Sequence, residues 1–213
     1  MSGNEGASGL VTRLKFTRSG GVVVEVDGEV IGEVDPAEFS RSRGDMLTAD
    51  EIEAVRLLAR RFDAHMKAAR SLARQSSSER GLVTRLRKKG VDPTAAAEAA
   101  RYYAGRGYID DMAFAKNKAD ELHSRKNYGR RRIAAELARL GVPQEAAKAA
   151  LEALPPDSEA IARAVARHRM GDLSDRNERA RQWRHFSAQG FAAEDIRAAL
   201  AGGDDFEEEY FDD

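Results

Sequence analysis

Two adjacent carboxylates, Asp110 and Asp111, are the residues whose types and spacing most suggest chemistry in this sequence. They stand in the stretch RGYIDDMAFAKNK, directly before a short apolar run. Paired carboxylates can hold a divalent cation or share the acid and base roles of a hydrolytic reaction. The same pair can also begin a helix, because an aspartate oxygen accepts hydrogen bonds from the first free backbone N–H groups.

The residues around the pair favour a helix start. With Asp110 as the N-cap, Asp111 falls at the first helical position, where a carboxylate complements the helix dipole. Ile109 and Phe114 then take the two positions of a hydrophobic staple, and Tyr108 is expected to pack at the same joint. The sequence therefore predicts a structural motif of Tyr108, Ile109, Asp110 and Phe114, and no metal site.

Other signs of catalysis are absent from the sequence. It contains no G-x-x-x-x-G-K-[ST], H-E-x-x-H, G-x-S-x-G or strand-associated G-x-G-x-x-G motif. The four histidines are scattered without the spacing of metal ligands, and the lack of cysteine excludes disulfides and thiolate zinc sites. We therefore expect a protein that is not an enzyme and needs no cofactor.

No apolar run approaches the roughly 18 residues needed to cross a bilayer, and the first residues lack the pattern of a signal peptide. We therefore expect a cytoplasmic protein without membrane contact.

The net charge of −1 hides a segregation of charge along the chain. Residues 56–141 contain 21 Lys and Arg against 9 Asp and Glu, whereas the segments before and after them are acidic. Within this basic middle, cations gather in RLRKKG (residues 85–90) and in SRKNYGRRRI (residues 124–133). A basic middle between acidic ends indicates a polyanionic partner or a protein surface of matching charge.

The elements that position these residues begin with a predicted β-hairpin. The segment Leu10–Val34 is rich in valine and is interrupted by Gly20-Gly21 and Asp27-Gly28, so two or three short strands are expected there. From Thr48 onward the pattern is helical, with Thr48 and Glu51 as a capping box.

A repeat organises the helical part. Three segments align on Gly90, Gly141 and Gly190, and apolar residues recur four before, one after, six after and ten after each glycine. Each glycine is expected to end one helix in the left-handed conformation, and a second helix follows it at once. With one more helix before each pair, at about residues 62–75, 111–125 and 158–169, the sequence predicts tandem three-helix units.

The predicted fold class is mainly α, with tandem three-helix repeats in an elongated curved body and a small N-terminal β-hairpin. The expected segments are 1–47, the leader and hairpin; 48–106, a linking helix and repeat 1; 107–155, repeat 2; 156–202, repeat 3; and 203–213, an acidic disordered tail.

Two of these stretches resemble signatures of the RecX family of bacterial recombination regulators. GYIDDMAFA (Gly107–Ala115) is similar to its G-Y-[IL]-[DN]-D-x-x-F-A signature, and KNYGRRRIAAELARLGV (Lys126–Val142) to its K-x-Y-G-x-x-R-I-x-x-E-L-x-x-x-G-[VI] block. The likeness covers roughly residues 62–201 and is strongest in the second unit. It departs from the family at Arg80-Gly81, where a leucine-like residue is expected.

The resemblance implies a function that periodicity does not. It implies a regulator, usually an inhibitor, of the RecA recombinase in DNA repair, homologous recombination and the SOS response, bound in the groove of the RecA–DNA filament. Single- and double-stranded DNA would be weak or filament-borne contacts, and the protein would be a monomer. A stand-alone helical DNA-binding protein or transcriptional regulator remains the alternative. On this interpretation the contact residues are Arg85, Lys88, Arg125, Lys126, Arg130, Arg131 and Arg132.

Overall fold

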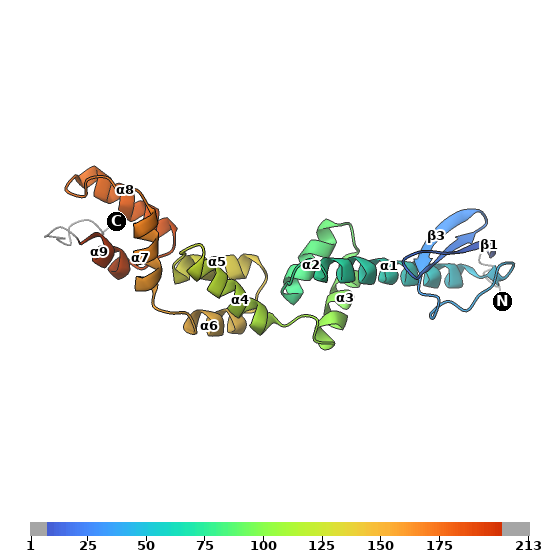
Figure 1. Cartoon of the computed structure of the whole chain (residues 1–213). Helices are drawn as coiled ribbons and strands as arrows, with labels where there is room; N and C mark the ends of the chain where they lie inside the picture. The colour runs from blue at the N-terminus through green and yellow to red at the C-terminus, as the bar shows by residue number, and fades with distance from the viewer. Residues whose placement is uncertain (1–7, 202–213) are drawn as a thin grey trace, which may run out of the picture. The chain divides into compact units, whose positions relative to one another are not determined.

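The computed structural model describes residues 8–201, so the predicted acidic tail lies outside the described residues. The chain divides into two compact units at the Ile109–Asp110 bond, and each is described by itself (Figure 1). The predicted fold class is confirmed: the described chain is mainly helical and begins with a small antiparallel sheet.

The first unit opens with a four-stranded antiparallel sheet in the order β3-β2-β1-β4. Its strands are β1 (Gly9–Phe16), β2 (Val22–Val26), β3 (Glu29–Val34) and the two-residue β4 (Met46–Leu47). The hairpin turn falls at Asp27-Gly28, where both residues have positive φ (51° and 83°), as predicted for a type I′ turn. β4 was not predicted, because two residues carry no detectable alternation.

Helix α1 (Ala49–Leu72) follows directly and covers the sheet, burying Val55 against the valines of β1 to β3. Its capping box is formed: Glu51 N donates to Thr48 Oγ1 at 3.3 Å, and Thr48 N donates to Glu51 Oε2 at 2.8 Å. The sequence analysis placed a linking helix before a repeat helix at about 62–75, whereas the structure has the single helix α1. No glycine or proline interrupts this segment, so one helix serves both the sheet and the first repeat.

The first unit ends with α2 (Glu79–Lys88) and α3 (Pro93–Gly105), which pack on the second half of α1. Asp92 caps α3 by accepting from the backbone N–H groups of Thr94 and Ala95. The core of this three-helix group consists largely of alanines and leucines, with Ile109 at its edge.

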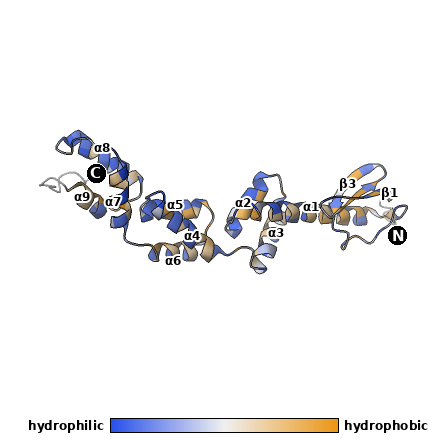
Figure 2. Ribbon diagram, viewed as in Figure 1, coloured by the Kyte–Doolittle hydropathy of each residue, from blue (hydrophilic) through white to orange (hydrophobic). Residues whose placement is uncertain are grey.

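The second unit contains two further three-helix groups. The first comprises α4 (Asp111–Ser124), α5 (Arg130–Arg139) and α6 (Gln144–Glu152), and the other comprises α7 (Asp157–Arg167), α8 (Arg176–Ala188) and α9 (Ala193–Leu200). Each group has its own apolar cluster. Helix α8 is drawn mostly in blue in Figure 2 because most of its residues are hydrophilic, and its buried residues are Gln182 and Phe186.

The three repeat glycines end their helices as predicted. Gly90, Gly141 and Gly190 have φ of 76°, 75° and 89°, in the left-handed region that glycine adopts without a Cβ penalty. The residue after each one is buried, so the turn directs Val91, Val142 and Phe191 into the three cores.

Candidate interaction surface

The carboxylate pair is a helix cap. Asp110 is the N-cap of α4, and its Oδ1 accepts from Ala113 N at 2.9 Å, while Asp111 occupies the first turn. Within residues 8–201, no group of three or more His, Asp or Glu side chains could hold a metal ion. The pair therefore begins α4, the helix that ends directly before Arg125 and Lys126.

The other members of the predicted motif lie in different surroundings. Ile109 is buried in the core of the first unit, and Phe114 packs against the core of the α4–α6 group. The staple between them stays a prediction. Tyr108 is 68% exposed, so its ring is available to a partner.

Arg130 is held inside the second unit. Its backbone N–H donates to Asp157 Oδ2 at 2.9 Å and its Nη1 donates to Asp157 Oδ1 at 2.7 Å, while Nη2 donates to the carbonyls of Leu154 and Pro155. Asp157 is only 8% exposed. Helix α5 has Gly129 at its N-cap and no side-chain cap of its own, so Asp157 caps it from 27 residues away.

Arg132 is also engaged within its unit. Its guanidinium lies 3.9 Å from the centre of the Tyr128 ring, a cation–π contact, and Nη1 donates to the carbonyl of Ala188. Beneath it, Gly129 and Gly190 bring two backbones together: Gly129 N donates to Gln189 O at 2.9 Å, and Arg131 N donates to Gly190 O at 3.3 Å. Arg132 and Arg130 thus join the α4–α6 group to the α7–α9 group.

A buried histidine completes this joint. His123 lies with its Nε2 3.8 Å from Asp157 Oδ1, and that nitrogen has no hydrogen-bond partner among the described residues. Burial lowers the pKa of His123, and Asp157 only partly opposes the effect. The imidazole is therefore neutral at pH 7 and packs in the joint.

Arg85 of the first unit is likewise tied down, because its guanidinium donates to Ser71 Oγ at 2.9 Å and to Ser77 Oγ at 3.4 Å. Both serines are buried. Arg85 therefore ties α2 to the end of α1 and to the loop that follows it.

Four of the seven predicted contact residues remain exposed. Lys88 lies at the end of α2 in the first unit, and Arg125, Lys126 and Arg131 flank the α4–α5 turn of the second. Asn127 shapes this turn with a φ of 53° and accepts from Arg163 Nε at 3.3 Å. Here "cationic turn" denotes Arg125, Lys126 and Arg131.

The electrostatic effect of the cationic turn reaches a neighbouring carboxylate. Lys118 holds the pKa of Glu121 below its ordinary range, chiefly through a hydrogen bond, and Arg125 and Lys126 add to the effect. An anionic group approaching the turn meets the same positive potential.

Sequence reasoning missed the pairing of Arg130 with Asp157. One signal could have found it: α5 begins after a glycine, which leaves its first N–H groups without a side-chain acceptor. An aspartate following Pro155-Pro156 was a candidate for that acceptor.

The three-helix groups define the class: a helical-repeat protein, here with a group of exposed cations in each unit. Comparison with known proteins gives the family. A family model described as the second three-helix domain of RecX matches residues 110–151. Regulatory protein RecX of Halorhodospira halophila is 34% identical over 143 residues, 66% of this chain and 88% of that protein. The Serratia proteamaculans protein of the same name is 32% identical over 155 residues, 68% and 92% of the two chains.

A crystal structure of regulatory protein RecX has the same fold, with a TM-score of 0.66 and 17% sequence identity over 92% of this chain and all of that one. The chain belongs to the RecX family of regulatory proteins. None of the described helices is long and apolar enough to cross a membrane.

Proposed function

We propose that this protein is a negative modulator of the RecA recombinase, acting as a cytoplasmic monomer. It would bind in the groove of the RecA–DNA filament and block filament extension, ATP hydrolysis and strand exchange. The observation that carries the proposal is membership of the RecX family, supported by relatives of which the chain covers about nine-tenths.

The exposed cations support a binding role. Lys88 and the cationic turn present charge to solvent, where acidic protein surface or DNA phosphate can reach them. We propose these four residues as direct contacts. Arg85, Arg130 and Arg132, which are hydrogen-bonded inside their units, would hold the helices that carry those contacts. This arrangement needs neither a catalytic group nor a cofactor.

The test is co-sedimentation with RecA filaments on single-stranded DNA, paired with the rate of ATP hydrolysis. Lys126→Glu with Arg131→Glu reverses two charges at the cationic turn. The matched control, Arg184→Glu with Arg197→Glu, reverses two exposed arginines on α8 and α9. We expect the first variant to lose at least tenfold in inhibition, about 1.4 kcal/mol or more of binding free energy, and the control to keep most of it. Equal loss in both variants would show that net charge, and not this turn, governs binding.

A second measurement distinguishes a RecA modulator from the alternative class, a stand-alone DNA-binding protein. Tight, sequence-specific duplex binding without RecA, with no effect on RecA ATP hydrolysis, would identify a stand-alone DNA-binding regulator and refute the proposal.

A further inference from the structure

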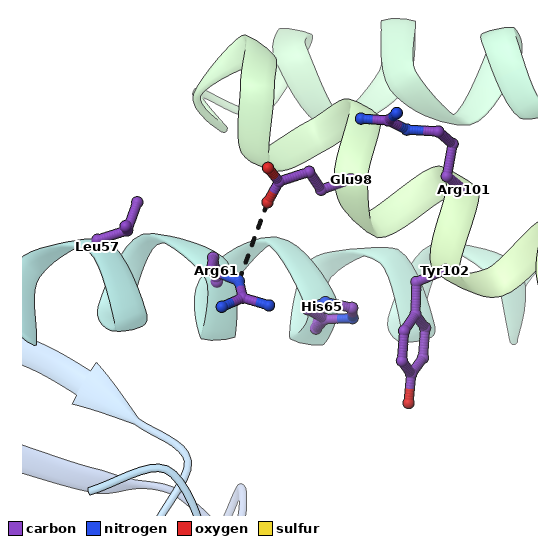
Figure 3. A pocket seen from close by; sticks show the side chains of 6 residues that line it. All are labelled: Leu57, Arg61, His65, Glu98, Arg101 and Tyr102. Carbon is purple, nitrogen blue, oxygen red and sulfur yellow. Dashed lines mark ion pairs between the residues drawn. The ribbon is translucent and has the colours of Figure 1, made fainter. Parts of the chain in front are cut away.

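A groove between α1 and α3 of the first unit plays no part in the surface described above. It has a volume of about 640 Å³ and is lined by Leu57, Arg61, His65, Glu98, Arg101 and Tyr102 (Figure 3). Pockets that bind small molecules typically measure about 300–1,000 Å³. In Figure 3, Leu57, Arg61 and His65 project from α1 and Glu98, Arg101 and Tyr102 from α3, with Tyr102 beside His65. We call this groove, together with Arg106, which contacts the Tyr102 ring, and Tyr108, which contacts the Tyr103 ring, the tyrosine–arginine groove.

A series of aromatic rings in contact with one another extends from the groove. The rings of His65 and Tyr102 meet edge to face at 4.6 Å, Tyr102 and Tyr103 at 5.2 Å, and Tyr103 and Tyr108 at 5.7 Å. Tyr103 anchors the series because its hydroxyl donates to the carbonyl of His65 at 3.2 Å. Tyr102 and Tyr108 keep 42% and 68% of their surface exposed. The rings are thus held in place while part of Tyr102 and most of Tyr108 stay exposed, an arrangement suited to stacking with a planar ligand.

The charges around these rings are mainly positive. Arg61 and Arg101 line the groove with one acid, Glu98, whose contact with Arg61 is long at 3.9 Å and exposed on both sides. Near His65, Arg106 adds a third cation and Glu38 a second acid. The Arg106 guanidinium lies 3.5 Å from the centre of the Tyr102 ring. An exposed ion pair of this kind contributes little to stability, so Arg61 can release Glu98 and bind an anion of the ligand instead.

His65 adds apolar surface and no positive charge. Burial lowers the pKa of His65, and the neighbouring Arg61 lowers it further, so the ring is neutral at pH 7. The groove therefore combines open aromatic faces with three permanent cations, which fits a ligand that has both planar rings and negative charges.

We infer that the tyrosine–arginine groove binds single-stranded nucleic acid, with bases stacking on Tyr102 and Tyr108 and phosphates held by Arg61, Arg101 and Arg106. Bases of a single strand present free faces to aromatic side chains, whereas those of a duplex are stacked on one another. An acidic peptide would satisfy the arginines but would leave the open tyrosine faces without stacking partners. This inference goes beyond the proposed function and does not depend on RecA.

The test uses the full chain and a fluorescein-labelled oligodeoxythymidine, which forms no duplex, with affinity read from fluorescence anisotropy. We expect Tyr108→Ala to weaken binding by about 5- to 150-fold, the range of one lost base stack. Tyr108→Phe, which keeps the ring, should bind like the parent protein. Phe16→Ala removes an exposed aromatic residue from the same unit outside the groove and should also leave affinity unchanged.

A charge variant gives an independent measurement. Arg106→Gln should lower the slope of log affinity against log salt by about 0.7, the loss of one phosphate contact on a single strand. Because Tyr102 contacts His65, the Tyr102→Ala change can disturb the fold. The circular dichroism of this variant is therefore compared with that of the parent protein before its affinity is interpreted. The inference is overturned if Tyr108→Ala and Arg106→Gln both keep parental affinity and salt dependence, or if duplex DNA of equal length binds as tightly as the oligodeoxythymidine.

RecA co-sedimentation of the Tyr108→Ala variant separates this inference from the proposed function. Retained inhibition with lost oligonucleotide binding supports a separate nucleic-acid site. Parental oligonucleotide binding with lost co-sedimentation would show that the groove contacts protein, which also overturns the inference.

Discussion

Asp157 provides the sharpest test of how the two helical groups of the second unit are joined. Its two carboxylate oxygens accept from the backbone and the side chain of Arg130, and it is almost fully buried. Replacing it with alanine removes both acceptors at once. The first N–H of α5 then has no acceptor, and the Arg130 guanidinium keeps only the carbonyls of Leu154 and Pro155.

The magnitude follows from these two losses. A helix cap is worth about 1 kcal/mol, and a hydrogen bond to a charged group about 1.5–3 kcal/mol. The Arg130 side chain retains 36% of its exposure, so water can replace part of the second interaction. We therefore expect Asp157→Ala to lower the free energy of unfolding by about 2–4 kcal/mol, and Asp157→Asn, which keeps an acceptor but not the charge, by about half of that.

Urea unfolding followed by fluorescence is the appropriate assay, because Trp183 is the sole tryptophan of the sequence and packs in the α7–α9 group. With a slope of about 2 kcal/mol per molar urea, typical of a small protein, the midpoint should fall by about 1–2 M. Asp120→Ala, which removes an exposed carboxylate from α4, is the control and should stay within about 0.5 kcal/mol. A midpoint for Asp157→Ala equal to that of the control would show that the carboxylate does not hold the joint.

Two further predictions concern the repeat glycines and a histidine of the α7–α9 group. Gly190→Ala should destabilise the second unit by more than 2 kcal/mol, because the new Cβ would meet Arg132 N at 2.3 Å. Gly90→Ala, where nothing lies within 4 Å of the new Cβ, should cost only about 1 kcal/mol of left-handed strain. Thermal melts measure both variants, and an equal loss of stability in the two would contradict the close approach at Gly190. Burial and the stacked His168 lower the pKa of His185, so the folded state favours its neutral ring and stability should fall as pH drops through the ordinary histidine range near 6.5. His185→Phe should weaken the dependence of the urea midpoint on pH between 7.5 and 5.5. An unchanged pH dependence would contradict the assignment of this effect to His185.

Local signals in the sequence were sufficient for the repeat and its caps. The glycines at 90, 141 and 190 and the cap at Asp110 depend on residues within one turn of a helix, so their chemistry is visible in the chain itself. Lys88, Arg125, Lys126 and Arg131 were predicted as contact residues from their charge and location in the sequence, and the structure leaves all four exposed.

The roles of the other arginines depended on partners distant in sequence. Arg130 meets an aspartate 27 residues away, Arg132 a carbonyl 56 residues away, and Arg85 a serine 14 residues away. A run of like charges gives no sign of which members will find such partners after folding. The tyrosine–arginine groove was missed for the same reason, since His65 and Tyr102 meet only when α3 folds back on α1.

The separate apolar clusters have a consequence for how the chain folds. Each three-helix group builds its core from residues within about fifty positions of one another, so few contacts require distant segments to meet first. Such a chain has low contact order and can begin folding in any group, with neighbours joining later through contacts such as that of Arg130 with Asp157. Hydrogen exchange should accordingly show the α7–α9 group opening as a cooperative block of its own, at a lower free energy than the α4–α6 group on which it docks.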